Sequence, residues 1–431
     1  MARIAEKMLD GLQRDSFEYF SREHNPSNGL IRDNTGRKSP ASIAVTGFGL
    51  AAYIVAVERG FMSRREALGR TLAAARFFDG ISREPEVNAT GYKGFYYHFL
   101  DMGKGTRVWH CELSTIDTGL LILGMLVAAQ YFAGDNPRER ELRERVGAIY
   151  RRVEWNWARD GRLTLTHGYH PETGFLKDRW GGYNEGLLLY ILGLGSPTHA
   201  LSPKSYGEWT KSYRWKRIYG HEYLYAGPLF IHQFLHVWID FRGRPDAYMR
   251  RKRSDYFENS RRAVYVQSEY CRRNPRGFKG YSALNWGITA CDGPGTHGRK
   301  IGDSRRRLFG YHARGVPFGP DDGTISAGAA AASLPLAPEI VLPTIEHFLS
   351  TDVGRRTPCG FAASFNTTAP NSSALGFWRS KENYGLNHGP LILMIENHRS
   401  GLIWNLMRDC LPVVSGMQRA GFSAAPVPLK K

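Results

Sequence analysis

The sequence predicts an all-α chain folded as a double-layered helical barrel. Helix-start signals recur along the 431 residues and mark roughly a dozen helices, with at most one small β-hairpin. Some of these helices are apolar on nearly every face, which requires that other helices enclose them, and others are amphipathic. Since no Pro/Ser/Gly-rich linker divides residues 1–431, we expect one domain, although a prior of about 150 residues per domain would suggest two or three. The alternative is an irregular helical bundle or solenoid, but the sequence shows no fixed repeat.

Cap residues mark the helices of the first half. The run SIAVTGFGLAAYIVAVERG, residues 42–60, opens on a serine and ends on a glycine. Two capping boxes follow, in which a serine oxygen accepts the N–H of the residue three places on: Ser63 with Glu66, and Ser114 with Asp117. Further cap signals stand at Asn136 with Pro137, at Asn184, and at Ser202 with Pro203.

The apolar pattern separates inner from outer helices. Residues 119–132 are apolar on nearly all sides, whereas residues 138–157 are strongly amphipathic. Residues 162–176, RLTLTHGYHPETGFL, are the one hairpin candidate, since apolar and polar residues alternate at their start. Helical stretches of the second half cover residues 227–241, 254–273, 338–349 and 389–407.

Composition excludes several classes of protein. The 58 Lys and Arg against 40 Asp and Glu give a net charge of +18, but the basic residues are scattered and no nucleic-acid-binding signature is present. We therefore expect a solvated, arginine-rich surface and no nucleic-acid partner. The 5 cysteines lack CxxC spacing, which argues against a disulfide framework or a zinc site. The longest apolar run, about 14 residues, is too short for a transmembrane segment.

The N-terminal residues 1–14 carry charges throughout and contain no apolar core of a secretory signal. The location therefore stays open: cytoplasmic, or periplasmic or secreted if a leader has been trimmed from the chain. The oligomeric state is not indicated by any pattern.

Carboxylates beside aromatic rings carry the functional prediction. No Walker loop, dinucleotide fingerprint, HExxH or GxSxG motif is present. Aromatic residues make up 13% of the chain, and glycine-rich loops with carboxylates, Trp and Tyr lie at 91–102, 174–185, 280–295 and 318–324. In glycoside cleavage one carboxylic acid protonates the leaving oxygen, a second carboxylate activates water or attacks, and aromatic rings stack on sugars. The pattern therefore favours a glycoside hydrolase.

Glu185 is the first candidate for the general acid. It follows Trp180 and two glycines and lies at a predicted helix start, where the helix dipole lowers the pKa of a group that must keep its proton. Burial or a neighbouring carboxylate has to raise that pKa if Glu185 is the acid. Glu112 and Asp117, in CELSTIDT, are the other candidates. The capping box already explains Asp117, whereas Glu112 precedes the cap at a loop mouth and is better placed to touch a ligand.

The histidines give a weak metal signal. His232 and His236 have the i, i+4 spacing of a helical metal site, but aromatic-flanked histidines more often hydrogen-bond substrate or backbone. We therefore predict no metal and no cofactor.

The remaining carboxylates in loops have a simpler explanation. Asp292, Asp321 and Asp322 are compatible with ordinary turns.

Six blocks of the sequence, in order along the chain, resemble the glycoamylase-like family. They include FYYHFLDM, ELSTIDTGLL, GGYNEGLLLYILGLGSPTH and PFGPDDGTISAGAAAASLPLAPE, and they run from about residue 15 to 408. This family contains endo-β-1,2-glucanases and resembles a domain of cyclic β-1,2-glucan synthases. The resemblance implies an (α/α)6 toroid and cleavage of a β-glucan, mostly with inversion, although the synthase-associated domains transglycosylate with retention.

The resemblance also implies site residues. It identifies Glu185 with the general acid of the family and places Glu112 and Asp117 in the same cleft. One block departs from the pattern: relatives read Ile-Asp-Gln-Gly-Pro before the last helix, where this chain has Asn387, which cannot act as a carboxylate base. The candidate replacements are Asp117, Glu112, Asp292, Asp322, Glu382 and His388. The residues expected to bind the glucan are Trp180, Tyr183, His221, Gln233, Trp286, Asp292, Asp321, Asp322, Trp378, Glu382 and Asn387.

Three functions therefore remain open from the sequence. The first is a hydrolase of β-glucan, with β-1,2 the linkage that the resemblance implies. The second is a transglycosylase that remodels or cyclises β-glucans, and the third is a non-catalytic glucan-binding protein. Asn387 motivates the second and the third.

Overall fold

Helices account for 47% of the residues in the computed structural model of the chain, which confirms the predicted all-α class. The structure describes residues 2–81, 89–295, 298–301, 304–354, 356–371 and 374–424. The residues group into two compact units. Unit 1 comprises Met1–Tyr19, Trp215–Val237 and Phe257–Ser400, and unit 2 comprises Phe20–Arg214, Trp238–Tyr256 and Gly401–Lys431. The single domain expected from the sequence stays a prediction.

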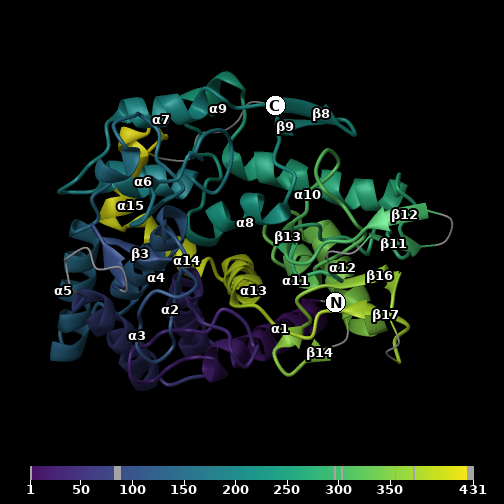
Figure 1. Cartoon of the computed structure of the whole chain (residues 1–431), viewed down its shortest axis with the longest axis horizontal. Coiled ribbons are helices and arrows are strands. Elements are labelled where there is room, and N and C mark those ends of the chain that lie inside the picture. The colour runs from purple at the N-terminus through teal and green to yellow at the C-terminus, as the bar shows by residue number, and fades with distance from the viewer. Residues whose placement is uncertain are drawn as a thin grey trace. The chain divides into compact units, whose positions relative to one another are not determined.

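Two apolar helices of unit 2 pack side by side (Figure 1), and their backbones meet at a pair of glycines. They are α2 (Ile43–Glu58) and α4 (Thr115–Tyr131), and the side chains of both are buried on nearly every face. A Cβ placed on Gly124 would collide with the backbone of Gly47, so the two backbones touch where any larger residue would separate them. These are the inner helices that the apolar pattern predicts.

The other helices of unit 2 are shorter or amphipathic. Asn136 caps α5 (Pro137–Arg151), which packs on α3 (Arg64–Asp79) through its buried face. Helix α6 packs on α15. The remaining helices of this unit are α6 (Leu187–Gly195), α7 (Pro203–Thr210), α9 (Ala247–Arg251), α14 (Leu402–Arg408), α15 (Leu411–Arg419) and the 3-10 turn η1 (Trp157–Arg159).

Short strands are more numerous than the one hairpin that the sequence predicts. The predicted hairpin exists, as β6 (Gly168–His170) and β7 (Gly174–Phe175). It is the edge of a five-stranded antiparallel sheet in unit 2, in the order β2-β3-β5-β6-β7. The other members are β2 (Gly91–Tyr92), β3 (Phe95–Tyr97) and β5 (Leu113–Ser114), and a separate pair is β1 (Ala41–Ser42) with β4 (Phe99–Leu100).

In its described residues, unit 1 contains helices, mostly from the C-terminal half, and five two-stranded sheets. The helices that lie wholly in it are α11 (Ala327–Ala331), α12 (Pro338–Ser350) and α13 (Gly385–Arg399), with η2 (Asp352–Gly354). The unit boundaries fall within or at the ends of α1 (Ala2–Arg22), α8 (Leu229–Trp238) and α10 (Tyr256–Arg273). The strand pairs are β8 (Trp215–Ile218) with β9 (His221–Leu224), β10 (Ala290–Cys291) with β13 (His312–Ala313), β11 (Gly298–Ile301) with β12 (Ser304–Arg307), β14 (Arg356–Thr357) with β15 (Gly360–Phe361), and β16 (Phe365–Pro370) with β17 (Phe377–Arg379).

Most predicted caps are confirmed, and two helix boundaries differ. Ser42, Ser63 and Ser114 each accept the backbone N–H of the residue three places on. Asn184 is not the cap of α6: it accepts the N–H of Gly186 in a turn, and the helix begins one residue later. The stretch 389–407 is two helices, because Gly401 adopts a left-handed φ of 69° between α13 and α14.

Among the described residues, no helix combines the length and apolarity that a membrane crossing needs.

Candidate active site

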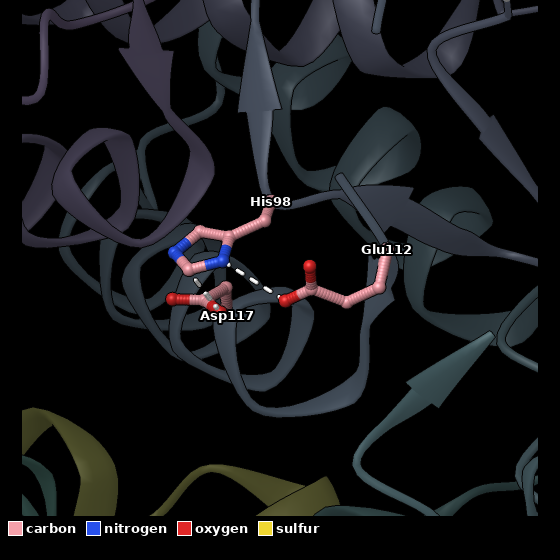
Figure 2. A group of neighbouring side chains, drawn as sticks. All are labelled: His98, Glu112 and Asp117. Atoms are coloured by element: carbon pink, nitrogen blue, oxygen red, sulfur yellow. Dashed lines mark hydrogen bonds and ion pairs between the residues drawn. The ribbon is translucent and has the colours of Figure 1, made fainter. Parts of the chain in front are cut away.

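The sheet of unit 2 places His98 opposite Glu112. The register of β3 and β5 pairs Tyr97 with Leu113, so the residues just beyond these strand ends face each other. The backbone N–H of His98 donates to the carbonyl of Glu112 at 3.0 Å. Their side chains meet as well, with His98 Nδ1 3.0 Å from Glu112 Oε1 (Figure 2).

The capping box at the start of α4 supplies the third member of this cluster. The backbone N–H of Asp117 donates to Ser114 Oγ at 3.2 Å, and the Ser114 hydroxyl donates back to the Asp117 carboxylate. Asp117 is only 6% exposed, and its Oδ2 lies 3.6 Å from His98 Nε2. The imidazole therefore stands between two carboxylates, as Figure 2 shows.

The charges of this cluster reinforce one another. Burial alone would lower the pKa of His98, but the charge of Asp117 and the hydrogen bond and charge of Glu112 outweigh it and raise the pKa to about 9. Burial raises the pKa of Glu112, but the hydrogen bond and charge of His98 outweigh it and bring the pKa below its usual value. At neutral pH, His98 is thus an imidazolium and Glu112 a carboxylate.

Glu185 belongs to the same unit, in the loop before α6. Two hydrogen bonds of the Tyr190 hydroxyl shape this loop: it donates to the carbonyl of Trp180 at 2.8 Å and accepts the N–H of Leu165 at 3.2 Å. The Trp180 indole N–H donates to Thr115 Oγ1 at 2.8 Å. Since Thr115 is the first residue of α4, this bond ties the Glu185 loop to the helix turn that carries Asp117.

Burial and a neighbouring carboxylate raise the pKa of Glu185 to about 7. Desolvation is the largest cause, the negative charge of Asp117 adds to it, and a backbone hydrogen bond opposes both. Because α6 begins at Leu187, Glu185 lies outside the helix, where the effect of the helix dipole is weaker. Glu112, Asp117 and Glu185 are therefore brought together within unit 2, and Glu185 is the one whose raised pKa keeps it partly protonated near neutral pH.

Aromatic rings line the same loop. Trp180 stacks on His167, with 4.0 Å between ring centroids, and is nearly buried. Tyr183 stacks on Tyr256 at 5.9 Å and meets Tyr213 edge-on. These predicted glucan-binding residues belong to aromatic clusters and are largely buried, at 6% and 7% exposed.

The other predicted residues belong to unit 1, where Asp292 and Glu382 lie near each other. The Ser380 hydroxyl donates to Asp292 Oδ2 at 2.8 Å, and it also contacts the Glu382 carbonyl at 3.0 Å. Asp292 and Glu382 are partly exposed, as is Trp378 on β17. His221 is also partly exposed and stacks on Tyr265.

Four predicted residues of unit 1 are buried and make hydrogen bonds within the protein, and their assignment to glucan binding stays a prediction. Asp322 forms an ion pair with Arg314 at 2.7 Å in which both side chains are 0% exposed. Asp321 is buried, and its carboxylate accepts hydrogen bonds from the hydroxyls of Tyr270 at 2.9 Å and Tyr281 at 2.7 Å. Gln233 donates to the Ala329 carbonyl and Trp286 to the Thr344 hydroxyl, and both side chains are buried.

Asn387 lies in the first turn of α13 and is partly exposed. Its neighbour His388 is buried, stacks on Tyr19 at 5.3 Å and lies 3.3 Å from Asn383 Oδ1. Burial lowers the pKa of His388 to about 4. His388 is therefore neutral at pH 7 and enclosed, which makes it a poor replacement for the missing base.

His98 is the site residue that the sequence analysis missed. It is also the centre of a group that has the donor set of a cation site, since ligand atoms of His98, Glu112 and Asp117 all lie within 4.8 Å of one another. The pair weighed from the sequence is not such a group: His232 Nε2 contacts the Ala226 carbonyl and His236 Nε2 contacts Ser260 Oγ. The expectation of no metal stays a prediction.

Solved structures share this fold over nearly the whole chain. A putative glucoamylase from Bacteroides uniformis matches with a TM-score of 0.86 and 29% identity, covering 98% of this chain and 99% of the other. An endo-β-1,2-glucanase from Chitinophaga pinensis, solved with sophorotriose and glucose, matches with a TM-score of 0.85 and 27% identity, covering 97% and 98%. This likeness confirms the predicted helical toroid.

A curated relative extends beyond this chain. The exo-β-1,2-glucooligosaccharide sophorohydrolase (non-reducing end) of Parabacteroides distasonis is 27% identical over 449 aligned residues. The alignment covers 96% of this chain, but the chain spans only 58% of the length of that relative.

A sequence model of one family, described as putative glucoamylase, matches residues 177–411. This stretch includes Glu185, Asp292 and Asn387 and covers more than half of the 431 residues. The chain therefore belongs to the putative glucoamylase family.

Proposed function

We propose that the chain hydrolyses β-1,2-glucans, with Glu185 as the general acid. The observation that carries this proposal is the pair of opposed carboxyl environments in unit 2. Burial raises the pKa of Glu185 to about 7, whereas His98 lowers the pKa of Glu112. Two carboxyls whose environments drive their pKa values apart are the arrangement that acid–base cleavage of a glycoside requires.

Glu185 has the protonation state that the acid step needs. A carboxyl with its pKa near 7 is still about half protonated at neutral pH, and it loses its proton readily to the glycosidic oxygen as the bond to the anomeric carbon breaks. Asp117 supports this state because its negative charge disfavours ionisation of Glu185.

Glu112 is the base in this proposal. It is ionised at neutral pH, its side chain is 25% exposed, and His98 orients it through the 3.0 Å hydrogen bond. Asp117 is the weaker candidate. Its side chain is only 9% exposed, and its carboxylate already accepts a hydrogen bond from the Ser114 hydroxyl and pairs with His98. In this proposal Glu112 supplies the carboxylate base that Asn387 cannot supply.

The linkage rests on the relatives. The sophorohydrolase and the glucanase from Chitinophaga pinensis are both named for β-1,2 linkages. We assign contacts with glucosyl units to the small exposed parts of the Trp180 and Tyr183 rings, which belong to the loop that carries Glu185.

The test compares Glu185→Gln and Glu112→Gln on two substrates: β-1,2-glucan, and sophorosyl fluoride, whose leaving group needs no acid. Both variants should lose activity on the glucan by about 100-fold or more. Glu185→Gln should keep most of its activity on the fluoride. Glu112→Gln should lose activity on both, and azide, which attacks without a base, should restore it. Glu144→Gln is the matched control, since Glu144 is exposed on α5.

Wild-type turnover of glucan by Glu185→Gln would show that another group is the acid. Product analysis decides the second candidate, a transglycosylase, which the absence of a carboxylate at Asn387 favours. Longer or cyclic glucans among the products of the wild type would favour that function over hydrolysis. Binding of glucan by wild-type protein that forms no product would identify a non-catalytic binding protein.

A further inference from the structure

Trp109 is a large apolar side chain left in solvent. It is 67% exposed, in the turn between β4 and β5 of unit 2. Its ring lies 5.3 Å from that of Phe99, and the Phe99 ring in turn stacks on His98 at 3.9 Å with an angle of 13° between the planes. A continuous line of rings thus runs from the carboxylate cluster of His98, Glu112 and Asp117 out to Trp109.

The turn that carries Trp109 is held in an unfavourable conformation. Trp109 and His110 have φ values of 57° and 49°, the left-handed region, which costs about 1 kcal/mol for each residue that is not glycine. Arg107 holds this turn in place, because its guanidinium donates to the carbonyls of Cys111 at 2.6 Å and His110 at 2.8 Å. Such strain persists where surrounding structure enforces it, and it gathers at sites of ligand binding.

Arg107 is itself locked in place. It is 8% exposed, pairs with Glu172 at 2.6 Å and stacks over Tyr97 at 4.6 Å. The fold therefore uses a buried arginine to present an exposed tryptophan rigidly. A ring held this way loses little conformational entropy when a ligand stacks on it.

A cavity of about 240 Å³ opens beside the indole, and its walls are basic. Arg37 and Lys38 line it, and both are exposed. Neither forms an ion pair with any residue in the described part of the chain. The other charged groups of the wall are already engaged: Arg32 pairs with Glu23 at 3.0 Å, and the Asp101 carboxylate accepts the N–H groups of Gly103 and Lys104.

We propose that Trp109, Arg37 and Lys38 form an outer glucan subsite that selects chains with acidic substituents. One glucosyl ring stacks on the indole, and an acidic group on that unit or the next pairs with the two cations. This inference rests on the proposed function, because the ligand is the same glucan that Glu185 and Glu112 are proposed to cleave. It gives the basic excess of the chain one defined role at the site.

The experiment measures binding without turnover. In a Glu185→Gln background, calorimetry gives the Kd for β-1,2-glucan oligosaccharides, either neutral or carrying succinyl half-esters. Trp109→Ala should weaken binding of both ligands by about tenfold, and Trp109→Phe should keep most of the affinity. The double substitution Arg37→Ala/Lys38→Ala should weaken only the acidic ligand and should flatten the dependence of its Kd on salt. Lys104→Ala is the control for loss of a nearby positive charge, to be compared with the single substitutions Arg37→Ala and Lys38→Ala, because Lys104 is exposed in the adjoining turn but does not line the cavity.

Two outcomes would overturn the inference. If Trp109→Ala binds both ligands as tightly as its parent, the indole is no subsite. If the double substitution leaves the Kd of the acidic ligand unchanged, the selection for acidic chains is wrong. The proposed function is tested separately. If the wild-type chain binds glucan through Trp109 but cleaves none of it, the subsite is supported and the proposed hydrolase activity is wrong.

Discussion

At position 185 two local effects oppose each other, and their magnitudes decide the role of the residue. A carboxylate in the first turn of a helix has a lowered pKa, worth about 0.3–1 kcal/mol. In the structure α6 starts after Glu185, and burial raises the pKa from 4.5 to about 7. The sequence pattern predicted that the helix dipole would lower the pKa of Glu185. Since the helix begins two residues later than predicted, that effect no longer argues against Glu185 as the acid.

His98 could not be found in the same way. Its contacts with Glu112 and Asp117 depend on the register of two strands of three and two residues, which are too short to show an alternating pattern. Glu112, Asp117 and Glu185 were predictable because their motifs are local or resemble those of a known family. His98, which contacts Glu112 and Asp117, is placed there only by pairing across the sheet.

The charge state of His98 predicts how the cluster responds to chelators. With its pKa near 9, His98 is protonated at pH 7 and offers no lone pair to a metal. We therefore expect that incubation with EDTA at pH 6–7 leaves glucan hydrolysis unchanged. A loss of activity that added Ca²⁺, Mg²⁺ or Zn²⁺ restores would contradict this expectation and would identify the cluster as a cation site.

At the scale of elements, local signals were predictable and tertiary ones were not. The caps at Ser42, Ser63 and Ser114 depend on bonds three residues apart, so the sequence reveals them directly. The close packing of α2 and α4 depends on Gly47 and Gly124, which are 77 positions apart and carry no local mark of their contact.

This close packing predicts a sharp difference between two glycine substitutions within helices. Gly124→Ala should lower the free energy of unfolding by about 1–3 kcal/mol, because the added methyl group meets the backbone of Gly47. Gly69→Ala in α3 is the matched control, since a Cβ there meets only Arg138 Nη2 at 3.5 Å. That substitution should instead stabilise the chain by about 0.5–1 kcal/mol. Denaturant unfolding measures both, and equal effects would contradict the close packing.

At the scale of the whole molecule, the excess of arginine is partly structural. Arg419 donates to the carbonyls of Leu194 and Leu201, and Arg179 donates to those of Arg159 and Thr164. These guanidinium groups satisfy backbone acceptors at helix ends and turns, as the last carbonyls of a helix require. The net charge of +18 is therefore a poor guide to the partner of this protein, and Arg37 and Lys38 matter because they are not used in this way.

The site also makes the stability of the molecule depend on pH. A raised pKa in the folded state means that folding favours the protonated form, so its stabilisation is complete below the unfolded pKa and disappears as the pH rises through the folded pKa. For Glu185 this window runs from 4.5 to about 7, and for His98 from 6.5 to about 9. Glu185→Gln cannot ionise at this position. Its free energy of unfolding should equal that of the wild type near pH 4.5 and exceed it at pH 8 by up to about 3 kcal/mol. His98→Gln should be less stable than the wild type at pH 6, and this difference should shrink toward pH 9. Urea unfolding of the three proteins at pH 4.5, 6, 8 and 9 tests both signs, and parallel pH profiles would show that neither group is coupled to folding.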